Sequence, residues 1–160
     1  MALDDFLGCY DTTVVVVHRY LFRACGGDQL LAEDLAQDVY TAALVRAREG
    51  DATVLALPWL LAVARNKLVD HFRRVDRERR KLALVERDVA DSTGDRDGPL
   101  IARLVSLPPL QRAAVALRYV DDLPVDEVAR ALGKSRKATE SLLSRARASL
   151  RRETPEARNA

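Results

Sequence analysis

The feature that most constrains how this chain folds is the stretch ARALGKSRKATESLL, residues 129–143. Ala129 is small enough to lie where two helices cross, and Gly133, four residues later, suits the turn between them. The aliphatic residues that can hold the second helix against the first are Leu132, Leu142 and Leu143. This spacing predicts a helix-turn-helix.

The second helix of this motif is expected to begin after Ser135, which is a good N-cap. Thr139 stands where Val or Ile is usual, and its hydroxyl can bond back to a helix carbonyl. The residues expected to face outward are Arg136, Lys137, Glu140, Ser141, Ser144, Arg145 and Arg147. Arginine can read guanine edges, and serine, lysine and further arginines can hold phosphates, so this face fits the major groove of DNA. A solvated basic helix in a bundle is the alternative.

The formal net charge of +2 conceals strong segregation of charge along the chain. Residues 65–81 hold eight Lys/Arg against three acids, and residues 130–152 hold eight against one. In contrast, residues 28–38 carry four acids and no base, and residues 86–98 carry five acids against two bases. The pattern predicts two basic surfaces, an acidic surface and a solvated acidic linker.

Apolar residues recur at helical spacing along most of the chain, although the stretch TTVVVV, residues 12–17, is strand-like by propensity. The first expected helix stops at Gly26–Gly27, and its apolar stripe is Phe6, Tyr10, Val14, Val17 and Leu21. The second is expected after the N-cap Asp28, with the stripe Leu31, Leu35, Val39, Ala42 and Val45. The third is expected from near Pro58, with the stripe Leu61, Ala64, Leu68, Phe72 and Val75.

Residues 88–99, DVADSTGDRDGP, have no apolar period and are predicted to be an interdomain linker. Beyond them, the two prolines of SLPPLQRAAVALRYV and the pair Leu123–Pro124 mark the starts of further helices. The expected fold is all-α, with two small helical domains joined by a flexible acidic linker. The predicted ranges are a first domain at 1–87, the linker at 88–99, a helix-turn-helix domain at 100–152 and a tail at 153–160.

The sequence offers no recognisable arrangement for catalysis or for a metal or other cofactor. Cys9 and Cys25 form no CxxC motif, and His18 and His71 complete no metal-ligand spacing. Both thiols are expected in or near the core, as inert packing residues. The longest apolar runs are too short to span a bilayer, which predicts a soluble cytoplasmic protein with no membrane partner.

Three segments carry a further pattern: LAEDLAQDVYTAAL (31–44), PWLLAVARNKLVDHFRR (58–74) and LPPLQRAAVALRYVDDLPVDEVARALGKS (107–135). In this order they resemble extracytoplasmic-function (group IV) sigma factors, the small two-domain promoter-specificity subunits of bacterial RNA polymerase. The resemblance spans roughly residues 5–152. In that family the first segment docks on the polymerase clamp, the second opens and reads the −10 element, and the third reads the −35 element.

The resemblance implies a role for each of the three polar surfaces. The expected clamp-binding residues are Asp34, Gln37, Asp38 and Thr41. The expected −10 DNA-binding residues are Asn66, Asp70, His71, Arg73, Arg74 and Arg77. The exposed face of the helix-turn-helix is assigned to the −35 element. For the clamp-binding residues, an ordinary solvated helix face remains the alternative.

The sequence departs from the family pattern in two places. The loop at residues 49–57, EGDATVLAL, lacks the aromatic that related sigma factors often carry, so capture of a flipped base there would rely on Asp51, Thr53 and backbone groups. The start of the recognition helix, RKATES, stands where a Gly-Thr-Val sequence is more usual. Trp59 is expected to pack in the core rather than to stack on a base.

The resemblance implies a sigma factor rather than an enzyme: it binds the clamp and flap regions of core RNA polymerase, directs it to promoter DNA and helps open the −10 region. Family members are commonly held inactive by an anti-sigma protein, which is therefore a further candidate partner. One alternative is a stand-alone helix-turn-helix regulator that binds duplex DNA without polymerase, commonly as a dimer. Another is an enzyme acting on nucleic acid, which the lack of clustered carboxylates disfavours.

Overall fold

The structure is a computed structural model that describes residues 3–85 and 100–151. Every regular element in these two ranges is helical, which confirms the all-α prediction for the part described. The predicted linker at 88–99 and tail at 153–160 lie outside the described residues. The chain divides into two compact units between Asp70 and His71, inside one long helix, whereas the sequence predicted a boundary at residue 87.

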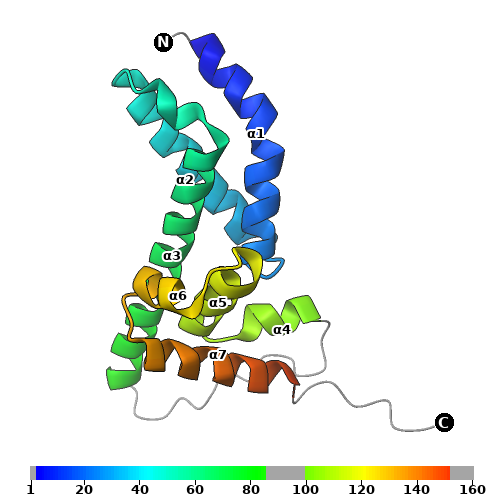
Figure 1. Cartoon of the computed structure of the whole chain (residues 1–160), viewed down its shortest axis with the longest axis vertical. Coiled ribbons are helices and arrows are strands. Elements are labelled where there is room, and N and C mark those ends of the chain that lie inside the picture. Colours follow the sequence, from blue (N-terminus) through cyan, green and yellow to red (C-terminus); the bar gives the residue numbers. More distant parts are fainter. Residues whose placement is uncertain (1–2, 86–99, 152–160) are drawn as a thin grey trace, which may run out of the picture. The chain divides into compact units, whose positions relative to one another are not determined.

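The first unit contains three helices that run in alternating directions (Figure 1). They are α1 (Leu3–Ala24), α2 (Gln29–Arg48) and the first part of α3 (Leu57–Val85), with a short 3-10 turn, η1 (Ala52–Leu55), before α3. The turn after α1 uses Gly26 and Gly27, both at positive φ. Asp28 caps α2 as predicted, because its Oδ1 accepts a hydrogen bond from the Leu31 N–H at 3.1 Å.

Helix α1 forms although its centre, TTVVVV, has strand-like propensity. Val17 and Leu21 are fully buried, whereas the neighbouring Val15 and Val16 are exposed. Burial of one face therefore outweighs the local preference of the β-branched residues, since most helical stability in proteins comes from packing an apolar face. The predicted first helix is confirmed.

The apolar stripe predicted for α2 is only partly right. Leu35 and Val39 are buried, but Val45 is 53% exposed. The buried residues of this helix are Ala32, Leu35, Ala36, Val39, Tyr40, Ala43 and Ala47. Four of these seven residues are alanines, whose small side chains let a neighbouring helix pack closely against this face.

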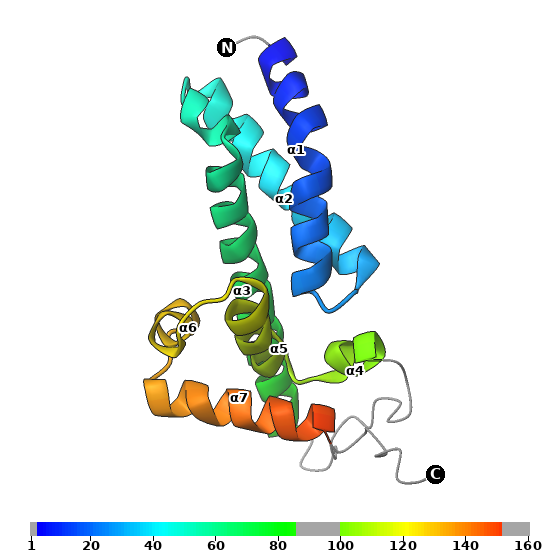
Figure 2. The same ribbon diagram turned by 45° about the vertical axis from the view of Figure 1, so that its right-hand side comes forward.

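The second unit contains four helices after residue 99. They are α4 (Leu100–Ser106), α5 (Pro109–Val115), α6 (Val125–Leu132) and α7 (Arg136–Arg151), with a π-helical turn, η2 (Ala116–Val120), after α5. Helices α5 and α6 begin at or just after a proline, as predicted. Helix α6 lies at the beginning of α7, and α4 lies near the end of α7 (Figure 2).

Candidate nucleic-acid interface

The turn between α6 and α7 has the geometry that the sequence predicted for a helix-turn-helix. Gly133 adopts a left-handed conformation with φ +62°. The Lys134 N–H donates to the Ala129 carbonyl at 2.9 Å, and the Gly133 N–H donates to the Arg130 carbonyl at 3.2 Å. These two bonds form a Schellman motif, which ends α6 and redirects the chain into α7.

Helix α7 begins as predicted and is anchored by a polar residue in the core. The Ser135 Oγ accepts a hydrogen bond from the Ala138 N–H at 3.1 Å, which caps the helix. Thr139 is fully buried, and its hydroxyl donates to the Ser135 carbonyl at 3.0 Å. This bond satisfies a hydroxyl that would otherwise be buried without a partner. Leu143 and Ala146 continue the buried face.

The exposed face of α7 matches the predicted DNA-binding set. All seven residues are exposed: Arg136, Lys137, Glu140, Ser141, Ser144, Arg145 and Arg147. The Arg145 Nε–H donates to the Ser141 carbonyl at 3.3 Å, one turn earlier. The helix therefore separates an apolar face packed on its own unit from a basic face available to a polyanion.

The first arginine of this face is already bonded to two carboxylates. The Arg136 Nη1 lies 2.9 and 3.1 Å from the two oxygens of Asp126 on α6. Its Nε lies 3.0 Å from the Glu140 Oε1, one turn along α7. The hydrogen bond to Glu140, together with the charge of Asp126, raises the pKa of Arg136 above its ordinary value. Sequence reasoning identified Arg136 but not this pairing.

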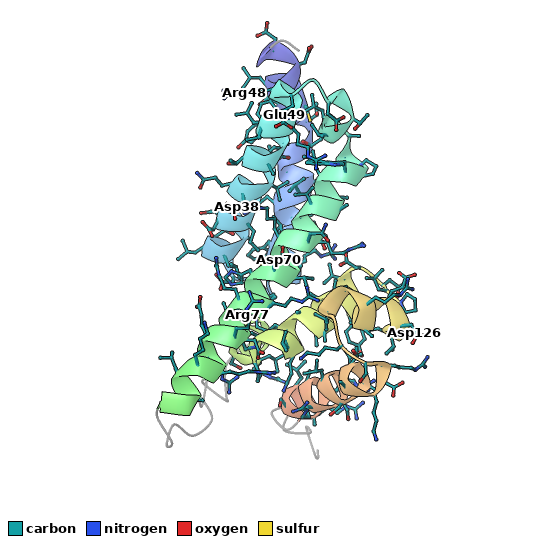
Figure 3. All side chains as sticks on the ribbon, turned by 90° about the vertical axis from the view of Figure 1, so that its left-hand side faces the viewer. Asp38, Arg48, Glu49, Asp70, Arg77 and Asp126 are labelled. Carbon is teal, nitrogen blue, oxygen red and sulfur yellow. The ribbon has the colours of Figure 1, made fainter. Side chains whose placement is uncertain are left out.

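The predicted −10 residues lie along α3, and they differ in exposure. Asn66, Asp70, Arg74 and Arg77 are exposed, and Figure 3 labels Asp70 and Arg77 on this helix. The half-buried residues are His71 and Arg73. The Arg73 Nη2 lies 2.7 Å from the position that a Cβ would take on Gly133, within the second unit. The Arg73 guanidinium therefore lies beside the turn of the helix-turn-helix.

The acidic face predicted on α2 is solvent-exposed. Asp34, Gln37, Asp38 and Thr41 all lie on it, and Figure 3 labels Asp38 on this helix. The Thr41 hydroxyl donates to the Gln37 carbonyl at 2.8 Å, so it is bonded within the helix. No ion pair of Asp34 or Asp38 is found among the described residues, which leaves both carboxylates available to a basic partner.

The predicted base-capturing loop is an ordered turn. Asp51 caps η1 by accepting from both the backbone N–H and the hydroxyl of Thr53. These two bonds hold the pKa of Asp51 below its ordinary value. The two side chains named for base capture therefore bond to each other, and the role of the loop stays a prediction. Trp59, just after it, is half-buried.

A polar contact between α1 and α2 was missed in the sequence. The hydroxyls of Thr13 and Tyr40 lie 2.9 Å apart in the core, and Thr13 also donates to the Cys9 carbonyl at 2.6 Å. Burial raises the pKa of Tyr40. The Cys9 Sγ donates to the Leu55 carbonyl at 3.0 Å. Cys25 is fully buried and Cys9 is half-buried, as expected for thiols in or near the core.

A groove between α1 and α2 was also missed. It has a volume of about 440 Å³ and is lined mainly by apolar side chains, with polar groups of α2 at its edge. The lining residues are Phe6, Tyr10, Val14, His18, Glu33, Ala36, Gln37, Tyr40, Thr41 and Leu44. The apolar stripe predicted for α1 contains three of them, but the sequence alone does not show that α2 leaves them partly uncovered.

Neither a metal site nor a membrane span is found in the part of the chain that the structure describes. Residues 3–85 and 100–151 hold no cluster of three or more His, Cys, Asp or Glu side chains arranged to bind a metal ion. Within the same ranges, no helix combines the length and apolar character that crossing a bilayer requires.

Two family models match the chain in sequence order. Residues 9–78 match Sigma-70 region 2, and residues 98–150 match Sigma-70, region 4. The first match covers α1 from residue 9, all of α2, and α3 to residue 78. The second match contains α4, α5, α6 and α7 up to residue 150, and therefore both helices of the helix-turn-helix apart from the last residue of α7.

Curated relatives agree with these matches. The chain is 32% identical to the ECF RNA polymerase sigma factor BldN of Streptomyces coelicolor, over 96% of this chain and 61% of that protein. It is 32% identical to the RNA polymerase sigma factor NccH of Alcaligenes xylosoxydans xylosoxydans, over 80% of this chain and 75% of that protein.

A third relative is the ECF RNA polymerase sigma factor SigF of Caulobacter vibrioides, with 31% identity over 82% of this chain and 75% of that protein. The chain spans only about three fifths of the length of BldN, but three quarters of NccH and of SigF. Both regions are thus present in this chain, with region 2 before region 4. The chain belongs to the sigma-70 family of RNA polymerase sigma factors, in its extracytoplasmic-function group.

Proposed function

We propose that this chain binds core RNA polymerase, directs it to specific promoters and helps open the −10 region. The observation that carries the proposal is the presence of sigma regions 2 and 4 in order, each with an exposed charged face of the sign its role needs. The chemistry of RNA synthesis belongs to the polymerase, and no catalytic role is assigned to this chain.

The polymerase clamp is the proposed partner of the acidic face of α2. Asp34 and Asp38 are exposed and without ion pairs among the described residues, so a basic helix can bind them without breaking existing contacts. Gln37 and Thr41 add hydrogen-bonding groups to the same face. The polymerase flap is the proposed partner of the second domain, which keeps its predicted range of 100–152.

Promoter DNA is the proposed partner of the two basic faces. The exposed residues of α7 would enter the major groove of the −35 element, where arginine and lysine can contact bases and phosphates. The exposed polar residues of α3 would hold the −10 strands once they separate, since arginines track the backbone and polar groups bind unpaired base edges. The acidic linker at 88–99 would connect the domains along a basic channel of the polymerase.

Regulation and location follow from the same assignment. An anti-sigma protein that covers the polymerase-binding and DNA-binding faces is a proposed partner, and the cytoplasm is the proposed location because transcription takes place there. The stand-alone regulator remains the alternative that an experiment must separate from a sigma factor.

The test is whether the purified chain binds core bacterial RNA polymerase, measured by fluorescence anisotropy of the labelled chain. We expect tight binding, and we expect the double variant Asp34→Lys with Asp38→Lys to lose at least ~100-fold in affinity, because two attractive charges become repulsive at one interface. The matched control changes Asp4 and Asp11 to Lys, since both are exposed acids of α1 and lie outside the docking face and the 49–57 loop.

Each outcome separates the candidate functions. Loss of binding in the docking-face variant alone supports a sigma factor and locates its clamp-binding surface. Equal loss in both double variants would show that overall charge, rather than this face, governs binding. No binding of the wild-type chain to core polymerase, together with sequence-specific binding of duplex DNA by the chain alone, would establish the stand-alone regulator.

A further inference from the structure

Arg136 is the first basic residue of the recognition helix, and two carboxylates bond to it at the same time. Its Nε bonds to Glu140 and its Nη1 bonds to both oxygens of Asp126. Reading a guanine edge takes two guanidinium N–H groups presented side by side. Such a pair includes either Nε or Nη1, and both of these nitrogens already bond to carboxylates, so a bidentate contact with guanine competes with at least one of these bonds.

The bonds lie at the surface, so DNA can compete for them. The side chains of Arg136, Asp126 and Glu140 are 62%, 61% and 52% exposed. Exposed ion pairs are weak and exchange readily, whereas a network with short bonds in good geometry biases a side chain towards one position. The network therefore makes release of Arg136 costly without preventing it.

The charge balance at the two ends of α7 also differs. Near its N-terminus, two carboxylates bond to the Arg136 guanidinium and offset its charge, whereas Lys137 in the same turn is exposed and forms no ion pair among the described residues. Towards the C-terminus, Arg145 and Arg147 are exposed on the same face. The carboxylates that offset part of the basic face of α7 thus lie at the N-terminal end of the helix.

We infer that Asp126 and Glu140 are specificity-determining residues that withhold Arg136 from sequence-independent contact with DNA phosphates. The inference rests on the proposed function of α7 as the −35 reader. Non-specific complexes are held almost entirely by phosphate contacts, so an added phosphate contact strengthens them fully. In the specific complex, base contacts of neighbouring side chains fix the register of the helix on the DNA. A released Arg136 is then less free to reach a phosphate and adds less affinity.

The experiment measures how well the holoenzyme distinguishes two duplexes. The wild-type chain with core polymerase first selects a preferred upstream element from a randomised duplex library. Affinities are then measured for that duplex and for a scrambled duplex of the same composition, over a series of salt concentrations. The variants are Asp126→Asn and Glu140→Gln, each also in an Arg136→Ala background, with thermal unfolding recorded to verify folding.

The matched control is Glu127→Gln. Glu127 neighbours Asp126 on α6, is exposed, and pairs with Arg130 at 3.9 Å rather than with Arg136. Glu127→Gln removes one negative charge from α6, as Asp126→Asn does. A general effect of charge would therefore appear equally in Glu127→Gln, whereas an effect that acts through Arg136 would not.

We expect Asp126→Asn and Glu140→Gln to bind the scrambled duplex ~3- to 10-fold more tightly, with the salt slope steeper by about 0.9 for the added phosphate contact. The affinity for the preferred duplex should rise less, so the ratio of the affinities for the preferred and the scrambled duplex should fall. In the Arg136→Ala background, neither substitution should steepen the salt slope.

Two results would overturn the inference alone: unchanged discrimination in both carboxylate variants, or equal effects of Asp126→Asn and Glu127→Gln. A wild-type holoenzyme that selects no upstream sequence would overturn the proposed function, and the inference with it.

Discussion

Two helix pairs in this protein, α1 with α2 and α6 with α7, are each bridged by a polar contact of the same length in opposite surroundings. The hydroxyls of Thr13 and Tyr40 lie 2.9 Å apart in the core of the first unit. Arg136 and Asp126 lie 2.9 Å apart at the surface of the second. The buried contact is shielded from water, so it stabilises the packing of α1 against α2. The exposed contact competes with water, salt and any polyanion that approaches.

The comparison shows that the environment of a polar contact, rather than its length, decides what it contributes. It also implies that α6 and α7 are held together by their apolar residues and their turn, and only weakly by the ion pair. The loss in the free energy of unfolding should therefore be largest for a substitution at the apolar anchor. It should then decrease in the order turn, buried hydrogen bond and surface ion pair.

The largest effect is expected from the apolar anchor of α7. Leu143 is 4% exposed, and Leu143→Ala should reduce the free energy of unfolding by about 2–5 kcal/mol, because it removes buried methyl groups and leaves a cavity. The matched control is Leu142→Ala at the neighbouring, half-buried position, which should cost clearly less. Urea denaturation monitored by circular dichroism measures both, and equal losses would contradict the assignment of Leu143 as the anchor.

The second largest loss of stability is expected from a substitution in the turn between α6 and α7. Gly133→Ala should destabilise the second unit by about 1–2 kcal/mol, because an L-residue is strained at φ +62° and because its Cβ would lie 2.7 Å from the Arg73 Nη2, which must then move. Gly8→Ala is the control with the opposite sign: Gly8 lies within α1, and a Cβ there would meet nothing within 4 Å. In a helix interior, alanine is favoured over glycine by about 0.5–1 kcal/mol. Destabilisation by both substitutions would show that the turn conformation is not the cause.

The helix-turn-helix could be predicted from the sequence because its signals are local. The small residue, the turn glycine and the capping serine all lie within seven residues of one another, and each has a direct steric or hydrogen-bonding reason. The exposed set on α7 followed from the helical period once the buried Thr139 and Leu143 were placed.

The remaining features depend on how separate helices approach each other. The pairing of Arg136 with Asp126 joins residues ten positions apart across a turn, and its existence depends on the angle between α6 and α7. Val45 is exposed because the buried face of α2 runs through Ala36 and Tyr40, on the side opposite Val45, and which side is buried depends on the neighbouring helices. The contact between Thr13 and Tyr40 joins two helices through the core. Helical periodicity contains none of this information.

The third prediction tests the buried contact through its pH dependence. Burial raises the pKa of Tyr40 above its ordinary value, so the neutral phenol is favoured in the folded state. The stability that this shift contributes is present below about pH 10, where the unfolded phenol is still neutral, and is lost as the pH rises through the folded pKa. Tyr40→Phe should cost about 0.5–1.5 kcal/mol at pH 7.

The same substitution should flatten the loss of stability above pH 10, because phenylalanine does not titrate. Urea unfolding between pH 8 and pH 11 measures this difference for the wild-type chain and the variant. Tyr119→Phe is the control, since Tyr119 is 55% exposed and its removal should leave the alkaline profile parallel to that of the wild type. Parallel profiles for Tyr40→Phe would contradict a role for burial at Tyr40.

The smallest effect is expected from the surface ion pair. In a double-mutant cycle with Asp126→Ala and Arg136→Ala, the coupling energy for unfolding should be about 0.2–1 kcal/mol, as is typical of exposed pairs. It should fall towards zero in 1 M NaCl, where the screening length is about 3 Å. A coupling energy well above this range and insensitive to salt would show that the ion pair mainly stabilises the fold. DNA could not then displace Asp126 from Arg136. A weak, salt-sensitive coupling is what a pair that DNA can displace requires, so this measurement on the free chain bears directly on how Arg136 meets a promoter.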